Sequence, residues 1–504
     1  MRSRPAFQGG GRGGFGPNRR GTGGPGLSRD RGLAERWSPE RIEDARAARG
    51  VIDLPREVVL ARIASHAARY PNLDPKPLDA DRMSMLDAAF AHALYDGCLR
   101  HWRSLGAVIH TACGKAVYEQ HPLTQAALMV GAVQLLVLDR VPPHAAVDSM
   151  VEWIKASMGV GASRFVNAAL RRVADICRRD SEGVVVRVPW AKRRDQFPLS
   201  DGRALQLAAD CYSPDRWIGL AEATSHTQGV ADHWRDRFGE EKALELLAHD
   251  LFAAPTIVNG RADPSVAEEA CLTPHSRDGY YVFNGDRAAM MSLLDRKTKV
   301  RVQDPTAGAA VALLVESGVM NGVRTPLVLD VCAGQGTKSR QVVAELSSAR
   351  VIASDVEARR MEILERLAGA GAGFEACEAK ALRANYTGTA DVVLLDVPCS
   401  NSGVLARRLE ARYRLDGSEV GRMVTLQKTI IADAMRLLKP GGVMVYSTCS
   451  IEREENEDQA RGLMEAGFSL ISERATLPAG VPGDAPAAYH DGGYAVLLRA
   501  PKQT

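Results

Sequence analysis

The chain has 504 residues, of which 45% are hydrophobic and 25% charged, the composition of an ordinary globular protein. At roughly 150 residues per domain, this length predicts three or four domains. No stretch of about 18 apolar residues without charge occurs, which excludes a transmembrane helix, and the first residues contain no apolar core of a secretory signal. The nine cysteines form no C-x-x-C pair. We therefore expect no disulfide scaffold, no bound metal and a reduced cytoplasmic setting.

The net charge of +3 is unevenly distributed along the chain. Residues 1–50 carry 11 arginines against 5 acidic residues, a balance of +6, so the other 454 residues sum to −3. Glycine, arginine and proline dominate residues 1–35, and such a segment buries too little apolar surface to fold, which predicts a disordered tail. Its arginines suit contacts with RNA phosphates, and a solubilising role explains the tail equally well.

Residues 36–185 have the apolar spacing of helices. The stretch LTQAALMVGAVQLLVLDR fits one buried helix, Pro142 and Pro143 end it, and HAAVDSMVEWIKASM follows as the next helix. A further helix is predicted for SRFVNAALRRVADICRR, which carries Arg171, Arg172, Arg178 and Arg179 toward its end. These arginines either complement the helix dipole or form an RNA-facing surface.

The order of these features resembles a known domain. An apolar helix, the string RVPPHAA, a second helix and then NAALRRV is the arrangement of the NusB-type domain that opens the RsmB/Sun/Fmu family of ribosomal RNA methyltransferases. The resemblance implies that residues 36–185 form a NusB-like, helical, RNA-binding domain. Residues 186–297 contain short strand-like runs around a helix and predict a small α+β connector. His226-Thr227 stands there in place of the family's His-Pro pair.

Residues 298–504 alternate short apolar runs with helical segments. The runs PLVLDV, ARVIASD, TADVVLLDV and GGVMVYST contain consecutive aliphatic residues, which is typical of buried parallel strands. Strands separated by helices form βαβ units, so we predict a doubly wound, Rossmann-like α/β domain. Ligands of such sheets bind beyond the carboxyl ends of the strands, and the polar residues of this segment fall there.

The first two of these strands end in residues that suit an adenosine ligand. Asp330 opens the small-residue turn DVCAGQGTK, whose backbone a ligand can approach closely and which leads into a helix N-terminus. The turn matches neither G-x-G-x-x-G nor a P-loop, which disfavours a dinucleotide site. Asp355 ends the second strand, where an acidic side chain can hydrogen-bond ribose hydroxyls.

Two cysteines follow the other two strands. Cys399 lies in the string DVPCSNSG, and Cys449 lies in STCSI, which EEN follows at residues 454–456. Carbon 5 of cytosine is a poor nucleophile, and addition of a thiolate to C6 activates it toward a methyl sulfonium. That chemistry needs an activated thiol, an acid group near N3 and N4 of the ring, and a base removed from its stack. Asp396, three residues before Cys399, is the candidate for the acid group, and the spacing leaves open which cysteine attacks.

These strings resemble the RNA 5-methylcytosine transferases, which include the RsmB/Sun/Fmu and NSUN enzymes. The resemblance implies that Cys449 is the nucleophile, that Cys399 assists release and that Asp396 steadies the pyrimidine. It implies S-adenosylmethionine as the cofactor, bound at the family's D-x-C-A-A-P-G-G-K-T loop and its neighbours: Cys332, Ala333, Gly334, Gln335, Gly336, Thr337, Lys338, Asp355, Glu378 and Asp396. Gln335 stands in place of a proline, and Thr337 in place of a glycine, which requires a backbone that a β-branched residue tolerates.

We therefore expect an S-adenosylmethionine-dependent RNA (cytosine-5-)-methyltransferase that forms a covalent adduct with C6. The NusB-like domain favours small-subunit ribosomal RNA as the substrate. The alternatives are the same chemistry on tRNA, or a non-catalytic RNA-binding factor of ribosome assembly, which the departures at Gln335 and Thr337 favour. We expect a monomer in the cytoplasm that binds RNA, with no binding to DNA or to a membrane.

Overall fold

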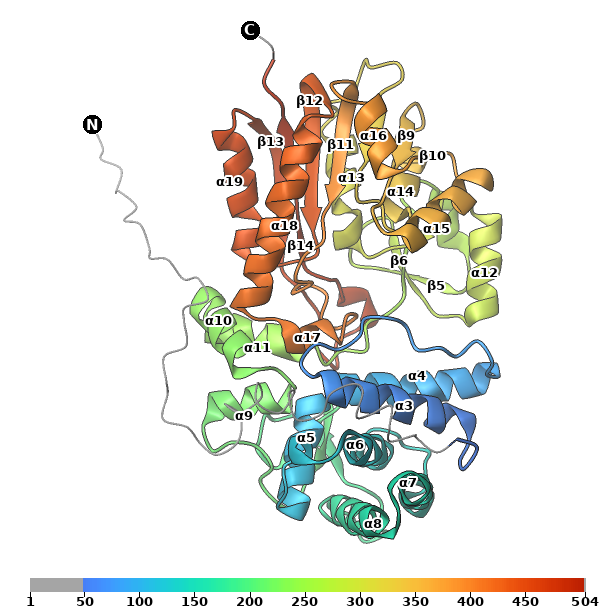
Figure 1. Ribbon diagram of the computed structural model, residues 1–504, viewed down its shortest axis with the longest axis vertical. Coiled ribbons are helices and arrows are strands. Elements are labelled where there is room, and N and C mark those ends of the chain that lie inside the picture. Colours follow the sequence, from blue (N-terminus) through green and yellow to red (C-terminus); the bar gives the residue numbers. More distant parts are fainter. Residues whose placement is uncertain (1–48, 503–504) are drawn as a thin grey trace, which may run out of the picture.

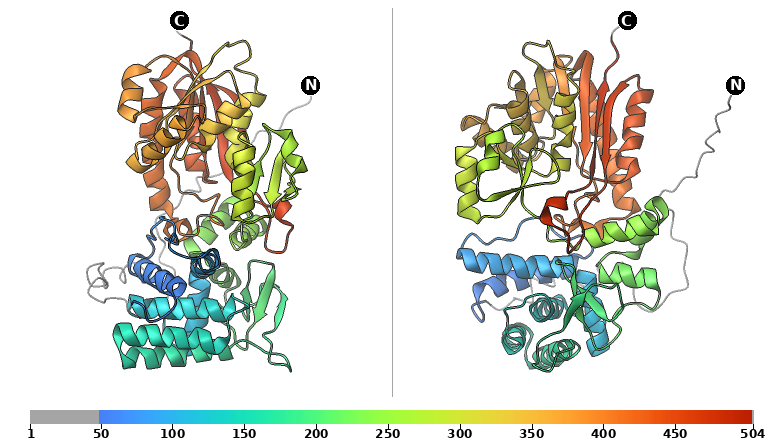
Figure 2. Two further views of the ribbon diagram at one scale, coloured as in Figure 1. Left: turned by 90° about the vertical axis from the view of Figure 1, so that its right-hand side faces the viewer. Right: turned by 180° about the vertical axis from the view of Figure 1, so that it is seen from behind.

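The computed structural model describes residues 49–502 (Figure 1). The tail predicted at residues 1–35 lies outside the described residues. Within 49–502, no helix is long and apolar enough to cross a bilayer, and no group of three or more His, Cys, Asp or Glu side chains is arranged to hold a metal ion. A helical part and a part built around a long sheet lie at opposite ends of the molecule, with smaller elements between them (Figure 2).

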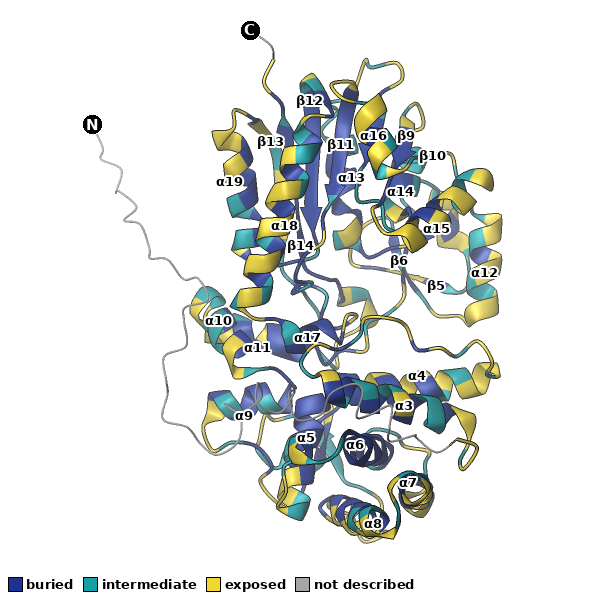
Figure 3. Ribbon diagram, viewed as in Figure 1, coloured by how far each residue is buried: buried dark blue, intermediate teal, exposed yellow. Residues whose placement is uncertain are grey.

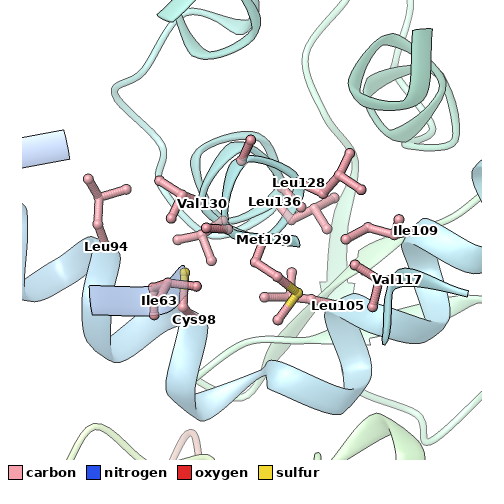
Figure 4. Packing of buried hydrophobic residues seen from close by; sticks show 14 of the residues in the cluster. Ile63, Leu94, Cys98, Leu105, Ile109, Val117, Leu128, Met129, Val130 and Leu136 are labelled. Carbon is pink, nitrogen blue, oxygen red and sulfur yellow. The ribbon is translucent and has the colours of Figure 1, made fainter. Parts of the chain in front are cut away.

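Helices make up most of the chain from residue 54 to residue 175. Their bounds are α3 (Leu54–Arg69), α4 (Met85–Arg100), α5 (Trp102–Cys113), η1 (Val117–Glu119), α6 (Pro122–Leu136), α7 (Pro143–Met158) and α8 (Val160–Asp175). The helix α6 is apolar on every side and is therefore enclosed by the others (Figure 3). Figure 4 shows Met129 and Val130 of α6 near Ile63 of α3 and Leu105 of α5. Because α7 begins at Pro143, the predicted break between these two helices is confirmed.

Two small sheets and several helices follow. The first sheet has the order β1-β3-β2, formed by β1 (Arg187–Pro189), β2 (Gln196–Pro198) and β3 (Arg203–Gln206). Three helices come next: α9 (Arg216–Ala223), α10 (Gln228–Phe238) and α11 (Glu240–His249). The second sheet has the order β5-β6-β4-β7, formed by β4 (Ile257–Asn259), β5 (Leu272–Pro274), β6 (Tyr280–Phe283) and β7 (Arg301–Val302), with η2 (Pro264–Glu268) and α12 (Arg287–Arg296) between its strands.

The predicted connector, residues 186–297, contributes to more than one hydrophobic core. Phe197 and Leu205 of the first small sheet pack into the core of the N-terminal helices. Trp217 and Leu247, from α9 and α11, pack instead with residues in the loops that follow strands β11 (Ala390–Asp396) and β12 (Leu438–Thr448) of the long sheet. The strand β7 belongs to the second small sheet although it lies beyond residue 297. Because side chains pack across the predicted boundaries, these boundaries remain a proposal about how the sequence divides.

The long sheet has the order β10-β9-β8-β11-β12-β14-β13. Its strands are β8 (Leu327–Asp330), β9 (Arg350–Ala353), β10 (Glu375–Ala376), β11 (Ala390–Asp396), β12 (Leu438–Thr448), β13 (Ser469–Thr476) and β14 (Gly493–Arg499). The strands from β10 to β12 in this order are parallel, whereas β14 is antiparallel to both of its neighbours. The predicted doubly wound α/β domain is confirmed, and the antiparallel pair β13 and β14 adds an edge that the sequence analysis did not predict.

Helices cover both faces of this sheet, so its strands are aliphatic on both sides. Their bounds are α13 (Pro305–Glu316), α14 (Thr337–Glu345), α15 (Ala358–Gly369), α16 (Ala379–Asn385), α17 (Ala411–Arg414), α18 (Gly417–Met435) and α19 (Glu457–Glu465), with η3 (Arg453–Glu455) and η4 (Pro486–Ala488). Val393 and Leu395 of β11 face the core shared with α16, α18 and α19. Val392 and Leu394 face the core shared with α13, α14 and α15.

A buried arginine joins the sheet part to the N-terminal helices. Arg412 lies in α17, between the long sheet and the helical part (Figure 1), and its side chain is among the largest that are fully buried. Its guanidinium donates hydrogen bonds to the backbone carbonyls of Arg100 at 2.9 Å, Thr224 at 3.3 Å and Asp250 at 2.5 Å. One side chain thus supplies donors to carbonyls from three separate stretches of the chain.

We expect Arg412→Ala to lower the free energy of unfolding by at least about 3 kcal/mol, because it leaves buried carbonyls without donors. The exposed neighbour Arg408 provides the control, since Arg408→Ala should change stability by no more than about 0.5 kcal/mol. Urea unfolding followed by circular dichroism measures both variants. Equal midpoints for the two would show that Arg412 does not stabilise the junction.

Candidate active site

The predicted site residues gather at one edge of the long sheet. The parallel strands β8, β9, β11 and β12 all end at this edge, and the register pairs Asp396 of β11 with Ser447 of β12. In Figure 1 the ends of β11 and β12 point toward α17 and the N-terminal helices. The four loops that follow these strands therefore lie side by side and face the helical part.

The loop after β8 turns sharply before it enters α14. Gly334 and Gly336 have φ angles of 58° and 76°, in the left-handed region that favours glycine. Thr337 is the first residue of α14 and is not among the described residues with positive φ. The conformation that a β-branched residue needs is therefore present. Gln335, the other departure from the family string, is exposed at the tip of the turn.

The side chains of Asp330 and Cys332, at the start of this loop, are largely buried. Burial raises the pKa of the Asp330 carboxyl to about 7, although the Ser339 hydroxyl donates to that carboxyl at 2.6 Å. Burial also raises the pKa of the Cys332 thiol, and the neighbouring carboxylates of Asp330 and Asp355 add to the effect. Cys332 is therefore a protonated thiol, suited to contact with a ligand and unsuited to nucleophilic attack.

Asp355 ties the second strand end to this loop. Its carboxylate accepts the backbone N–H of Gly334 at 3.0 Å and that of Glu357 at 2.9 Å, one on each oxygen. Each carboxylate oxygen can accept more than one hydrogen bond, so capacity for a ligand remains. Glu378 is exposed at the start of α16, directly after the residue whose N–H pairs with the end of β9. Asp355 thus contacts the loop after β8, and Glu378 lies one residue beyond a contact with the end of β9.

Lys338 reaches across from α14 to the end of β11. Its ammonium lies 2.7 Å from one carboxylate oxygen of Asp396, and the Ser447 hydroxyl donates to the other oxygen at 2.9 Å. Burial opposes the charge on Lys338, but Asp396 outweighs it and holds the pKa of Lys338 above its usual value. The lysine predicted to wrap the cofactor is therefore paired with the carboxylate predicted to contact the pyrimidine.

The two predicted thiols are in contact. The sulfur atoms of Cys399 and Cys449 lie 3.1 Å apart, although 50 residues separate them in the chain. Cys399 is buried, and its pKa is raised well above the usual value, first by the hydrogen bond with Cys449 and then by burial. Cys399 therefore retains its proton, whereas Cys449 is the more accessible of the two.

A buried carboxylate holds the two thiol loops together. Glu455 accepts hydrogen bonds from the Ser400 amide at 2.9 Å, the Ser400 hydroxyl at 2.5 Å, the Ser450 hydroxyl at 2.5 Å and the Gln427 side chain at 3.0 Å. Burial raises the pKa of Glu455 in spite of these donors. Glu455 lies in the string EEN, whose spacing along the chain gave no indication of this role.

A second buried carboxylate ties the Cys449 loop to α10. Glu452 accepts a hydrogen bond from His233 at 2.7 Å and one from Trp234 Nε1 at 3.2 Å, and Arg237 lies 3.3 Å away. Burial opposes the charge on Glu452, but His233 and Arg237 outweigh it and keep the pKa of Glu452 below its usual value. The helix α10 therefore helps to position the loop that carries Cys449.

The arginine pair after Cys399 has different surroundings at its two members. Arg407 lies 2.8 Å from Asp491 and 3.5 Å from Asp304, and its guanidinium stands over the ring of Tyr489. Burial, together with the nearby Asp491, raises the pKa of Asp304 to about 7. Arg407 is thus tied to an internal network although part of its side chain is exposed, and its neighbour Arg408 is exposed as well.

The last strand, β14, lies beside the loop that carries Cys449. Thr448 of β12 pairs with Tyr494 of β14. At Gly493, an added Cβ would lie 2.7 Å from the Thr448 carbonyl oxygen and 3.5 Å from the Cys449 Cα, so only glycine allows this approach. The start of β14 therefore packs directly against the backbone of the Cys449 loop.

We expect Glu455→Ala to lower the free energy of unfolding by about 3 kcal/mol, because several buried donors lose their acceptor. The loops should also loosen, so that iodoacetamide alkylates Cys399 much faster than in the unchanged protein, as peptide mass spectrometry would measure. Glu465→Ala, at an exposed position on α19, is the control. Continued protection of Cys399 in Glu455→Ala would show that this carboxylate does not hold the loops.

Comparisons with known proteins agree with this architecture. The family model "16S rRNA methyltransferase RsmB/F" matches residues 319–473, and the NusB family matches residues 60–175. The putative methyltransferase MT1451 of Mycobacterium tuberculosis is 29% identical over 79% of this chain and 84% of its own length. The ribosomal RNA small subunit methyltransferase B of Vibrio cholerae is 26% identical over 81% of this chain and 90% of its own length.

A solved structure shares the fold along nearly the whole chain. The crystal structure of PH0851 matches with a TM-score of 0.62 and 18% sequence identity, and the match covers 89% of this chain and 99% of that one. The two family matches fall on the helical part and on the long sheet, in the order that the sequence analysis expected. The chain therefore carries a NusB domain at residues 60–175 ahead of an RsmB/F-type methyltransferase domain at residues 319–473, which is the architecture of an S-adenosylmethionine-dependent RNA methyltransferase.

Proposed function

We propose that the protein transfers a methyl group to carbon 5 of a cytosine in RNA, and that this RNA is the small-subunit ribosomal RNA. The observation that carries the proposal is the contact of the two thiols, Cys399 and Cys449, at 3.1 Å beside Asp396 and the loop after β8. The NusB domain and the names of relatives such as the Vibrio cholerae enzyme support ribosomal RNA over tRNA.

The loop after β8 has the features that S-adenosylmethionine requires. An added side chain at Gly334 would meet nothing within 4 Å, so there is open space beside the turn. We assign the methionine part of the cofactor to residues 332–338, the ribose to Asp355 and the adenine side to Glu378. Asp396 borders both this place and the thiols. When bound there, S-adenosylmethionine supplies an electrophilic methyl group.

The pair of Asp396 and Lys338 suits the polar edge of a cytosine. The carboxylate of Asp396 can accept a hydrogen bond from the N4 amino group of the ring. Lys338 donates one of its three N–H groups to Asp396, so it still has donors for N3 or for the ring carbonyl. The Lys338 donors draw electron density from the ring and make C6 more susceptible to attack by a thiol, while the Asp396 carboxylate positions the N4 amino group.

The two thiols divide the covalent steps in this proposal. The sulfur of Cys449 adds to C6, and carbon 5 then attacks the methyl group, whose bond to the sulfonium sulfur breaks and leaves its electron pair on that sulfur. A base removes the proton from C5, the C5–C6 double bond forms again, and the bond between C6 and the Cys449 sulfur breaks. Cys399 retains its proton 3.1 Å from that sulfur and can therefore donate to it as it leaves.

All nine cysteines are free, which agrees with a protein that acts in a reducing compartment. We therefore keep the cytoplasm as the proposed location and a monomer as the proposed form, with no role in binding DNA. The case for a non-catalytic assembly factor is weaker than the sequence alone indicated. That alternative relied partly on the assumption that Thr337 does not suit the backbone of the loop. Thr337 begins α14 without a positive φ, so this part of the argument no longer holds.

We expect labelled methyl groups to pass from S-adenosylmethionine to naked small-subunit ribosomal RNA with the unchanged protein and not with Cys449→Ala. With Cys399→Ala, an RNA–protein adduct should survive a denaturing gel, because release from C6 is impaired. Cys98→Ala, a buried thiol of the helical core, is the control and should leave the labelling intact.

Labelling of tRNA alone would move the proposed substrate to tRNA. Cofactor binding with no label on either RNA would favour the assembly factor. An adduct with Cys449→Ala rather than with Cys399→Ala would exchange the two proposed thiol roles.

We expect Asp355→Ala to weaken the binding of S-adenosylmethionine by about tenfold, since the loop amide and the ribose both lose an acceptor. Glu362→Ala removes the same charge from an exposed position on α15 and should leave affinity unchanged. Isothermal titration calorimetry without RNA measures both variants. Equal affinities would remove Asp355 from the cofactor site.

A further inference from the structure

Asn401 has a backbone conformation that most residues avoid. Its φ angle is 64°, in the left-handed region, where a non-glycine residue costs roughly 1 kcal/mol or more relative to the right-handed helical conformation. Asparagine tolerates this region better than most side chains, but glycine tolerates it best. The position directly follows the Cys399-Ser400 pair, so a side chain is present where a glycine would fit the backbone more easily.

The carboxamide of Asn401 lies between the two thiol loops. Its Nδ2 donates a hydrogen bond to the backbone carbonyl of Cys399 at 3.0 Å, and its Oδ1 lies 3.3 Å from the sulfur of Cys449. Because a backbone carbonyl only accepts hydrogen bonds, the nitrogen of the carboxamide must face Cys399. The oxygen is then turned toward Cys449, where it can only accept a hydrogen bond from the S–H group.

The three groups form a chain of hydrogen bonds with one direction. Cys399 retains its proton, and its S–H faces the Cys449 sulfur at 3.1 Å. The S–H of Cys449 in turn faces Asn401 Oδ1. A carboxamide oxygen accepts from a thiol and gives no hydrogen bond to a thiolate, so this contact opposes loss of the Cys449 proton. The S–H of Cys399 and the ammonium of Lys338 also face this sulfur, and both act in the opposite direction.

We propose that Asn401 is a positioning residue that holds Cys449 as an oriented, neutral thiol until a pyrimidine enters the site. The inference rests on the proposed role of Cys449 as the nucleophile and adds a control on it. Alkylation and oxidation of cysteine both begin at the thiolate. A nucleophile held as a thiol, 3.1 Å from a second sulfur, is therefore protected while no RNA is bound.

The test is the pH profile of Cys449 alkylation by iodoacetamide, without RNA or cofactor and read by peptide mass spectrometry. Asn401→Gly keeps the left-handed backbone and removes the carboxamide, so Cys449 should react about fivefold faster at neutral pH and its profile should move to lower pH. Asn401→Asp places a negative charge beside the sulfur, so the profile should move to higher pH. Lys192→Gly relieves a left-handed φ of 61° at an exposed site and is the control for strain alone.

Opposite shifts in Asn401→Gly and Asn401→Asp support the proposal, because a general loosening of the loop would move both profiles in the same direction. An unchanged profile in Asn401→Gly, or shifts of the same sign in both variants, would overturn it. The readout needs no methyl transfer. If the unchanged protein labels no RNA, the proposed function fails while the alkylation result still decides the role of Asn401.

Discussion

The buried carboxylate of Glu455 is the contact on which the arrangement of the active site depends. Its donors come from both thiol loops and from α18, so one residue sets the separation of two cysteines that lie 50 residues apart. A buried charge is stable only when hydrogen bonds compensate for the lost water, and four are present here. The same contacts keep Cys399 buried and protonated beside an accessible Cys449.

Two further buried side chains connect the thiol loops to elements nearer the N-terminus. Glu452 connects the Cys449 loop to α10, and Arg412 connects the chain after Cys399 to carbonyls of the helical part. Both thiol loops are therefore anchored outside the methyltransferase sheet. The chain after Cys399 thus contacts the NusB domain through Arg100, and the Cys449 loop contacts the segment that follows this domain, which gives a physical reason for the parts to occur in one chain.

Local sequence patterns predicted most of the fold, because runs of aliphatic residues determine strands that are buried on both faces. They also placed Asp396, Cys399 and Cys449 at one edge, since parallel strands end together. The contact of Lys338 with Asp396 and the role of Glu455 depend on which loops become neighbours, and spacing along the chain carries no such information. Thr337 shows the reverse case: the sequence raised the question of a strained backbone there, and no such strain is present because the helix begins at that residue.

The antiparallel strand β14 has a consequence for how the protein is made. Residues 493–499 are synthesised after every residue that they contact in β12, and Gly493 packs against the backbone that carries Cys449. The parallel strands and the helices between them come earlier in the chain, so they can pair before β14 adds the wall beside Cys449. The loop after β8 can therefore form before the backbone that carries Cys449 is held in its final place.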